Sequence, residues 1–261
     1  MIPSLTRFNK IKNMEIKEYD KKVAPRVGIV AMYYGEPGTG KTFNALSYPS
    51  PMLVIDTENR CELVLRQQED DKEVYIAPAT NLTDIREALN FFYQKTKNLD
   101  TSSNILSKGT IVIDSATMLL QMAQEEYLKV SGAQKIYPQF MWGEVYAILD
   151  DLIMKLRNLG FNIVFTAQVK DEYTDQTKTG KRIIDIYKRI PFWCDLIVAC
   201  VSDSETGARD LTVIKNGYGP NHYFKISSGM EGLSEVLEIK DDPTETVEVK
   251  EEDKEECSQS A

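Results

Sequence analysis

A glycine-rich segment at residues 35–42 has the most informative spacing in this chain. It matches the pattern Gly-x-x-x-x-Gly-Lys-Ser/Thr in full, and an apolar, β-prone run at residues 27–34 precedes it. Glycines at a strand-to-helix turn let successive backbone N–H groups point inward and bind an anion. The segment therefore predicts a site for the phosphates of a nucleotide. The residues expected there are Gly35, Glu36, Pro37, Gly38, Thr39, Gly40, Lys41, Thr42 and Phe43.

Side chains at the end of this loop and on a later strand could complete the site. Lys41 can reach the β- and γ-phosphates, and the Thr42 hydroxyl is a suitable ligand for Mg²⁺. Asp114 ends the apolar run at residues 110–113, which is typical of the Walker B position, where a carboxylate holds magnesium through water. The absence of an Asn/Thr-Lys-x-Asp element argues against GTP. ATP and Mg²⁺ are the expected ligands.

The elements that must position these residues alternate along the chain. Near-continuous apolar runs separated by helical patterns predict an α/β fold with a mostly parallel sheet and helices on both faces. Closely spaced runs at residues 210–226 predict an antiparallel edge. The strands are expected at residues 27–34, 52–55, 74–77, 110–113, 162–167, 196–201 and 211–215, and helices at 84–97, 116–130 and 142–158.

The charge of the chain is concentrated at one end. Of the net charge of −9, residues 241–261 contribute −7, from nine acidic and two basic side chains, so residues 1–240 carry only −2. Such a tail has little to bury and is expected to be disordered. Residues 1–25 are mixed polar and basic and predict an N-terminal arm. A nucleotide-binding domain is therefore expected at residues 26–240.

Composition excludes several classes of function. No apolar run approaches membrane-spanning length and no signal-peptide core is present, so we expect a cytoplasmic protein without a membrane partner. The cysteines Cys61, Cys194, Cys200 and Cys257 form no Cys-x-x-Cys pair and are expected to be reduced thiols. His222 is the only histidine, which argues against a histidine-based zinc site or catalytic triad.

Residues 53–58, with the sequence Leu-Val-Ile-Asp-Thr-Glu, resemble the RecA/RadA recombinase family. In that family the general-base glutamate follows the strand after the P-loop helix in a similar motif. The resemblance assigns to Glu58 the orientation and deprotonation of the water that attacks the γ-phosphate. Position 115 holds serine, where AAA-type ATPases usually place a catalytic glutamate, so the base must come from elsewhere. Asp56 is the alternative base, or it caps the turn.

Two further segments resemble the same family. Residues 165–168 have the sequence Phe-Thr-Ala-Gln, and the resemblance implies that Gln168 contacts the γ-phosphate and relays the nucleotide state to the next loop. Residues 212–216 resemble the Val-Lys-Asn stretch of RecA. That similarity implies that Lys215 reaches the triphosphate held by a neighbouring subunit; a lysine lying along the surface at a strand end is the alternative.

The segment at residues 169–182 occupies the place of the family's second DNA-binding loop. Its basic residues could contact phosphates, and its tyrosine could stack on a base. Because three acidic residues dilute this charge, a hairpin or solvated loop without a nucleic-acid role is the alternative. The candidates for contact with single-stranded DNA are Lys170, Tyr173, Lys178, Lys181, Arg182, Lys188 and Arg189.

The resemblance covers roughly residues 27–226 and is greatest to the compact phage and archaeal-virus RecA-like ATPases. It implies a RecA-like P-loop NTPase that hydrolyses ATP, acts on single-stranded DNA in recombination, annealing or replication, and forms a ring or short filament. A single-stranded DNA-binding protein is an implied partner, and the host cytoplasm is the implied location of a viral member. No Phe-x-x-Ala polymerisation motif occurs in residues 1–25, which leaves filament formation open.

Two other classes of function remain as alternatives. One is a nucleotide-gated accessory or loading factor with little turnover. The other is a small-molecule phosphotransferase, against which the two strands expected between the P-loop and Asp114 argue.

Overall fold

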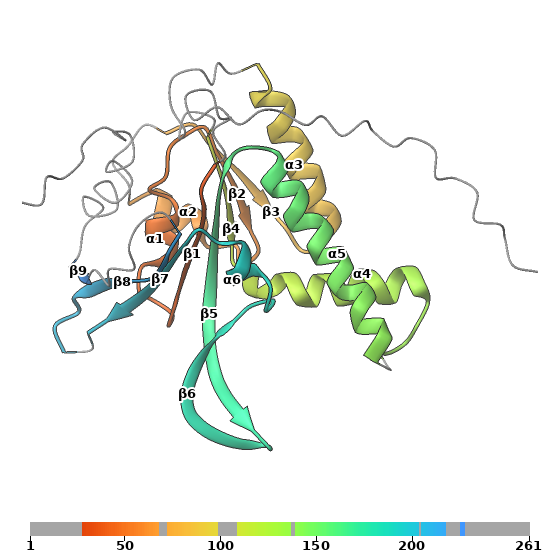
Figure 1. The fold of residues 1–261 in the computed structure, drawn as a ribbon. Coiled ribbons are helices and arrows are strands. Elements are labelled where there is room, and N and C mark those ends of the chain that lie inside the picture. Colours follow the sequence, from red (N-terminus) through yellow and green to blue (C-terminus); the bar gives the residue numbers. More distant parts are fainter. Residues whose placement is uncertain are drawn as a thin grey trace, which may run out of the picture.

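A mostly parallel sheet forms the centre of the chain in a computed structural model, which describes residues 28–67, 72–98, 109–136, 139–203, 205–217 and 225–227. The strand order is β3-β2-β4-β5-β1-β7-β8-β9, with β6 paired to β5 alone (Figure 1). The strands are β1 Val30–Gly35, β2 Met52–Asp56, β3 Val74–Pro78, β4 Thr110–Asp114, β5 Asn162–Thr174, β6 Thr177–Asp185, β7 Leu196–Ser202, β8 Arg209–Asn216 and β9 Lys225–Ser227.

The sheet is parallel from β3 to β7 and antiparallel at one edge. β1 lies between β5 and β7, although β5 follows it by more than a hundred residues in the chain. From β1 the chain runs to β2 and β3 at one edge and then returns through β4 and β5, past β1, to β7, so the connections that leave the neighbouring strands β1 and β5 run in opposite directions across the sheet. In open α/β sheets ligands bind outside the carboxyl ends of the strands at such a switch point. β7, β8 and β9 are joined by antiparallel pairing.

Helices cover both faces of the sheet. The helices are α1 Lys41–Ala45, α2 Cys61–Leu65, α3 Leu82–Thr96, α4 Leu119–Ser131, α5 Gln139–Asn158 and α6 Ile190–Trp193, and the 3₁₀ turn η1 spans Ala116–Met118. Strand residues alternate between two apolar clusters: Met32 lies with α3, α4 and α5, whereas Ala31 and Tyr33 lie with α1 and α2. This alternation follows from the period of two in a β-strand, and both faces are thereby buried.

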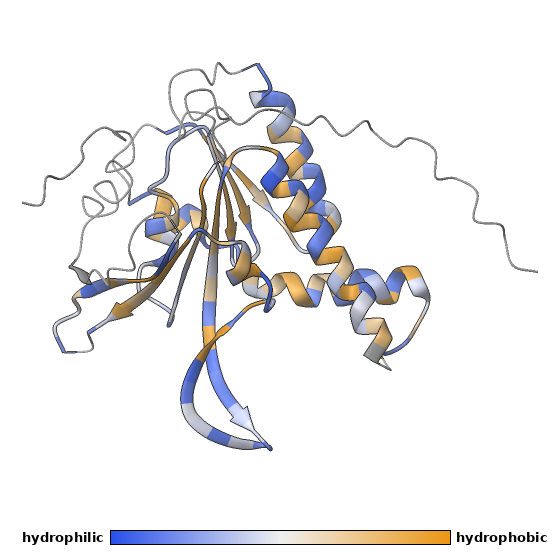
Figure 2. Ribbon diagram, in the orientation of Figure 1, coloured by the Kyte–Doolittle hydropathy of each residue, from blue (hydrophilic) through white to orange (hydrophobic). Residues whose placement is uncertain are grey.

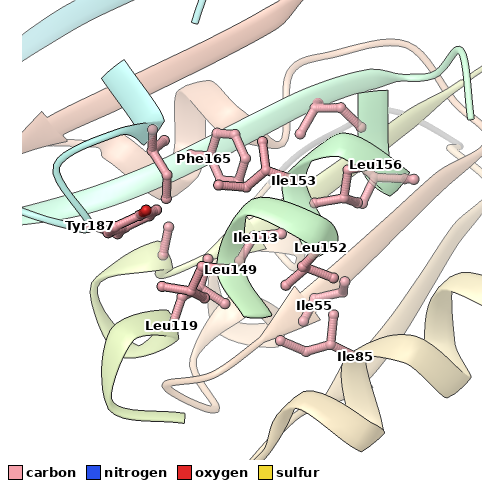
Figure 3. Packing of buried hydrophobic residues seen from close by; sticks show 14 of the residues in the cluster. Ile55, Ile85, Ile113, Leu119, Leu149, Leu152, Ile153, Leu156, Phe165 and Tyr187 are labelled. Carbon is pink, nitrogen blue, oxygen red and sulfur yellow. The ribbon is translucent and has the colours of Figure 1, made fainter. Parts of the chain in front are cut away.

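The larger apolar cluster holds the longest helices against the sheet. Figure 3 shows Ile85 of α3 and Leu149, Leu152, Ile153 and Leu156 of α5 packed toward Ile55, Ile113 and Phe165 of the strands. Full burial of each such side chain contributes about 1.5–3 kcal/mol relative to exposure. The start of α3 is fixed separately, because the Asn81 side chain accepts hydrogen bonds from the backbone N–H groups of Thr83 and Asp84.

The predicted fold class is confirmed, and the largest difference is the extension of β5 and its pairing with the nine-residue strand β6. The predicted helix at residues 116–130 begins as a 3₁₀ turn. β5 continues to Thr174 and forms a hairpin with β6, in the segment predicted as a DNA-contacting loop or as a hairpin or solvated loop without that role. The predictions for residues 1–25, residues 241–261, His222 and Cys257 lie outside the described residues. Cys61, Cys194 and Cys200 are buried free thiols, as expected. Within the described ranges, no helix is long and apolar enough to cross a membrane.

Candidate nucleotide-binding site

The loop after β1 has a backbone path that only glycine allows at several positions. A Cβ atom on Gly35 would lie 2.2 Å from the carbonyl oxygen of Cys200 on β7, so a side chain cannot fit there. Gly38 and Gly40 have φ angles of 81° and 89°, in the left-handed region. The glycine spacing of the sequence is therefore explained by close strand packing at the first position and by backbone conformation at the other two.

Lys41 folds back over this loop. Its Nζ donates to the carbonyl oxygens of Gly35, at 3.0 Å, and Glu36, at 2.7 Å. Burial lowers the pKa of the lysine, and nearby acidic groups, including Asp114 and Glu58, oppose that shift. Burial also raises the pKa of the neighbouring Cys200 thiol to about 12, so that thiol is neutral at physiological pH. The ammonium is thus held inside the loop, where phosphate oxygens are expected.

Thr42 and Asp114 meet across the start of α1 and the end of β4. The Thr42 hydroxyl donates to Asp114 Oδ2 at 2.8 Å. Asp114 is only 6% exposed, and it also accepts hydrogen bonds from Thr166 of β5 and, at 3.2 Å, from the thiol of Cys61. The peptide bond from Asp114 to Ser115 is cis. These contacts fix the carboxylate beside the threonine hydroxyl.

This pair suits magnesium bound to phosphates. A hydroxyl and a carboxylate are the hard oxygen ligands that Mg²⁺ prefers. No group of three or more His, Cys, Asp or Glu side chains in the described part of the chain could hold a metal by itself. The remaining ligands would have to be phosphate oxygens and water, as is usual for Mg²⁺ in phosphoryl-transfer sites.

Glu58 lies at the same edge of the sheet, bound by residues from two neighbouring strands. Its Oε1 atom accepts hydrogen bonds from Ser115 Oγ at 2.7 Å and from Gln168 Nε2 at 2.8 Å. These residues follow β2, β4 and the buried part of β5, which are adjacent and parallel. The structure thus brings together Glu58 and Gln168. The contribution of Ser115 was missed, although its place directly after Asp114 was a usable signal.

Asp56 has the arrangement of a turn cap. It is 3% exposed, and its two carboxylate oxygens accept from the backbone N–H groups of Glu58, at 3.1 Å, and Cys61, at 2.8 Å. The next residue, Thr57, ties β2 to β4: its hydroxyl accepts from the N–H of Ser115 at 2.8 Å. Of the two carboxylates considered as a base, Asp56 therefore has both oxygens bound to backbone N–H groups, whereas the hydrogen bonds of Glu58 from the described residues go to Oε1.

Comparison with known families agrees with this geometry. A family model described as "AAA domain" matches residues 28–230, which is most of the chain. The chain belongs to the AAA-domain family. No curated protein matches it. The AAA domain is a P-loop ATPase domain, and nucleotide binding is the activity that this membership supports.

The DNA-contact candidates of the AAA domain lie mostly on the β5–β6 hairpin, and most of them face acidic partners. Ion pairs join Lys170 to Asp185, Lys178 to Asp171 and Arg182 to Glu36, each at 2.7 Å. The bond from Lys178 is the main reason that the pKa of Asp171 is lowered. Lys181 forms no ion pair with the described residues. Tyr173, near the hairpin tip, is 61% exposed.

The remaining candidates have partners outside the phosphate loop of their own chain. Arg189 pairs with Asp150, and Lys188 lies 5.4 Å from the centre of the Tyr146 ring. Lys215 donates to the carbonyl oxygens of Pro191, at 3.1 Å, and Phe192, at 3.4 Å, on the short helix α6. It occupies the end of β8 opposite to the phosphate loop. Its predicted action on a neighbouring subunit stays a prediction.

Proposed function

We propose that this AAA domain hydrolyses ATP in a RecA-like manner, with Glu58 as the general base. The observation that carries the proposal is the contact of one Glu58 oxygen with both Ser115 and Gln168, next to the Thr42–Asp114 pair. Within the described part of the chain, no donor binds the other oxygen, Oε2. That atom is left to accept a proton from water.

Each residue then has a defined role in the reaction. The loop N–H groups and Lys41 bind the phosphates, and Thr42 and Asp114 would hold Mg²⁺, which neutralises charge on the β- and γ-phosphates. Glu58 orients a water molecule and takes its proton as the water oxygen bonds to the γ-phosphorus and the bond to ADP breaks. Gln168 and Ser115 keep the Glu58 carboxylate in place, because a fixed base loses less entropy in the transition state.

The replacement Glu58→Gln tests this assignment. A glutamine keeps an oxygen that can accept from Ser115 and Gln168 but cannot take a proton from water. We expect ATP affinity to be retained and hydrolysis to fall by roughly 10²-fold or more. Glu87→Gln on the exposed side of α3 is the matched control and should be fully active. Normal turnover in Glu58→Gln would place the base elsewhere. Low turnover in the unmodified protein would instead favour an accessory factor gated by nucleotide.

We also propose that the β5–β6 hairpin contacts single-stranded DNA. Support comes from the exposed Tyr173, from Lys181 and from the way the hairpin extends beyond the sheet (Figure 1). Residues 168–185 contain four basic and four acidic side chains, so the hairpin itself has no net charge. Stacking on Tyr173 should therefore contribute more than phosphate contacts, and DNA binding should depend weakly on salt.

ATPase measurements with and without single-stranded DNA test the hairpin proposal. Stimulation by DNA that is reduced in Tyr173→Ala supports it, with Phe192→Ala as a control for loss of an exposed aromatic ring elsewhere. Equal activity with and without DNA contradicts it. A single-stranded DNA-binding protein remains a proposed partner, which pull-down with the purified protein would test.

Assembly into a ring or short filament is a further part of the proposal. A neighbouring subunit would present Lys215, Arg182 or Arg189 to the triphosphate, because transition-state charge in P-loop enzymes is often stabilised by a cation supplied in trans. Light scattering with a non-hydrolysable ATP analogue should show oligomers. A monomer whose activity per molecule is independent of concentration contradicts the assembly.

A further inference from the structure

Arg209 lies against the phosphate-binding loop, although it is separated from it by most of the chain. It is the first residue of β8 and is exposed. A Cβ atom built on Gly40 would lie 3.3 Å from Arg209 Cδ and 3.8 Å from its Nη1 atom. The guanidinium group is therefore beside the residue that directly precedes Lys41. No recognised motif contains Arg209.

Strand register explains how Arg209 reaches this place. Gly35 is in register with Cys200 of β7, and Cys200 is paired in turn with Leu211 of β8. Leu211 lies in the apolar cluster that also holds residues of α1. Because side chains alternate along a strand, Arg209 points to the same face as Leu211, one step closer to the loop. Its position is thus set by the paired edge of the sheet.

The positive charge of Arg209 is not neutralised by any carboxylate in the described part of the chain. Its guanidinium has no hydrogen bond or ion pair with any described residue. By contrast, Arg182 is paired with Glu36, and Lys215 is bound to carbonyl groups of α6. A guanidinium group next to a loop that binds anions, and without a carboxylate partner, adds to the positive potential of that loop.

We propose that Arg209 binds the α- and β-phosphates of the nucleotide held by its own chain. This inference rests on the proposed function. The backbone N–H groups of a P-loop cradle the α- and β-phosphates, whereas the lysine reaches the γ-phosphate, and Arg209 lies at the backbone of Gly40. A guanidinium group can form two parallel hydrogen bonds to phosphate oxygens. ATP and ADP share the phosphates in question, so both should depend on Arg209.

Calorimetric titration of the full chain with ADP and with a non-hydrolysable ATP analogue tests the proposal. Arg209→Ala should weaken both ligands by about tenfold or more, as expected for loss of a charge-assisted hydrogen bond. Arg209→Lys keeps the charge but not the paired geometry, so it should bind with intermediate affinity. Arg66→Ala removes a similar charge from the exposed residue that follows α2 and should bind like the unmodified protein. Thermal unfolding without nucleotide checks that each variant is folded.

The outcomes separate this inference from the proposed function. If the unmodified protein binds neither nucleotide, the proposed function fails first. If it binds both and Arg209→Ala binds equally well, the role of Arg209 is wrong while the site stands. A loss for the ATP analogue without a loss for ADP would place Arg209 on the γ-phosphate and overturn the assignment made here.

Discussion

The two halves of β5 lie in different surroundings, although they belong to one strand. Residues 162–167 are buried between β1 and β4, whereas residues 168–174 leave the sheet and pair with β6 alone. Phe165 is 1% exposed and Tyr173 is 61% exposed. Figure 2 shows the same change along this strand, from hydrophobic residues in the sheet to hydrophilic ones in the outer hairpin.

The difference shows how the protein combines a buried site with an exposed extension. Packing on both faces fixes Thr166 beside Asp114, and Gln168 follows at the point where burial ends. Beyond that point, exposed ion pairs hold the hairpin, and such pairs contribute about 0–1 kcal/mol each. One of these pairs, between Arg182 and Glu36, connects the hairpin to the phosphate loop. Ile184 of β6 still packs against the larger apolar cluster, so the base of the hairpin is joined to the core while its outer part is exposed.

Replacing Lys41, in the phosphate loop beside the buried half of β5, should have the largest effect of the changes considered. Lys41→Ala removes the ammonium that lies within the phosphate loop, and we expect no measurable ATP binding or hydrolysis. Lys181→Ala on the hairpin is the matched control and should retain basal hydrolysis. Equilibrium binding of a fluorescent ATP analogue measures the difference. Equal binding by Lys41→Ala and the control would show that the loop is not the nucleotide site.

Truncating an aromatic ring in each half of β5 compares their packing directly. Phe165→Ala should lower the free energy of unfolding by about 3–5 kcal/mol, because it leaves a cavity among buried side chains. Tyr173→Ala should change that free energy by less than about 0.5 kcal/mol, as is usual for exposed positions. Urea denaturation followed by circular dichroism measures both. Similar losses in the two variants would mean that the hairpin is packed against the domain.

Gln168 lies where the buried half of β5 meets the exposed half, and its side-chain amide donates to Glu58. Replacing it tests whether this boundary residue supports hydrolysis. In Gln168→Ala, Ser115 remains as the hydrogen-bond donor to Glu58 Oε1 among the described residues. We expect hydrolysis to fall by about tenfold with ATP affinity nearly unchanged. Gln121→Ala provides the control, because Gln121 also donates to a glutamate but lies on the exposed surface of α4. Steady-state assays that separate kcat from KM test this: a lower kcat with an unchanged KM supports the role of Gln168, and an unchanged kcat contradicts it.

The ion pair between Glu36 and Arg182 should contribute least to the free energy of unfolding. A double-mutant cycle of Glu36→Ala and Arg182→Ala should give a coupling free energy of unfolding between about 0.2 and 1 kcal/mol. Because both side chains are about half exposed, the coupling should decrease as salt is added. Urea denaturation at low and high salt measures it. A coupling that is large and independent of salt would show that the hairpin is fixed to the loop.

The sequence by itself determined the features that depend only on residues close together in the sequence. The spacing of residues 35–42, the apolar runs of the strands and the periodicity of α3, α4 and α5 are all local patterns, and the structure follows them. Helices α2 and α6 span only five and four residues, which is too short for a periodic signal.

Only the tertiary structure decided which distant residues meet. Ser115 reaches Glu58 because β4 lies beside β2, and Arg209 reaches Gly40 because β8 is placed near β1 by its pairing with β7. Likewise, the basic residues of the hairpin face acidic partners that only the register of β5 with β6 and the closeness of Glu36 bring to them. Strand order and register arise from packing of the whole sheet, so contacts between residues far apart in the chain carry no local signal.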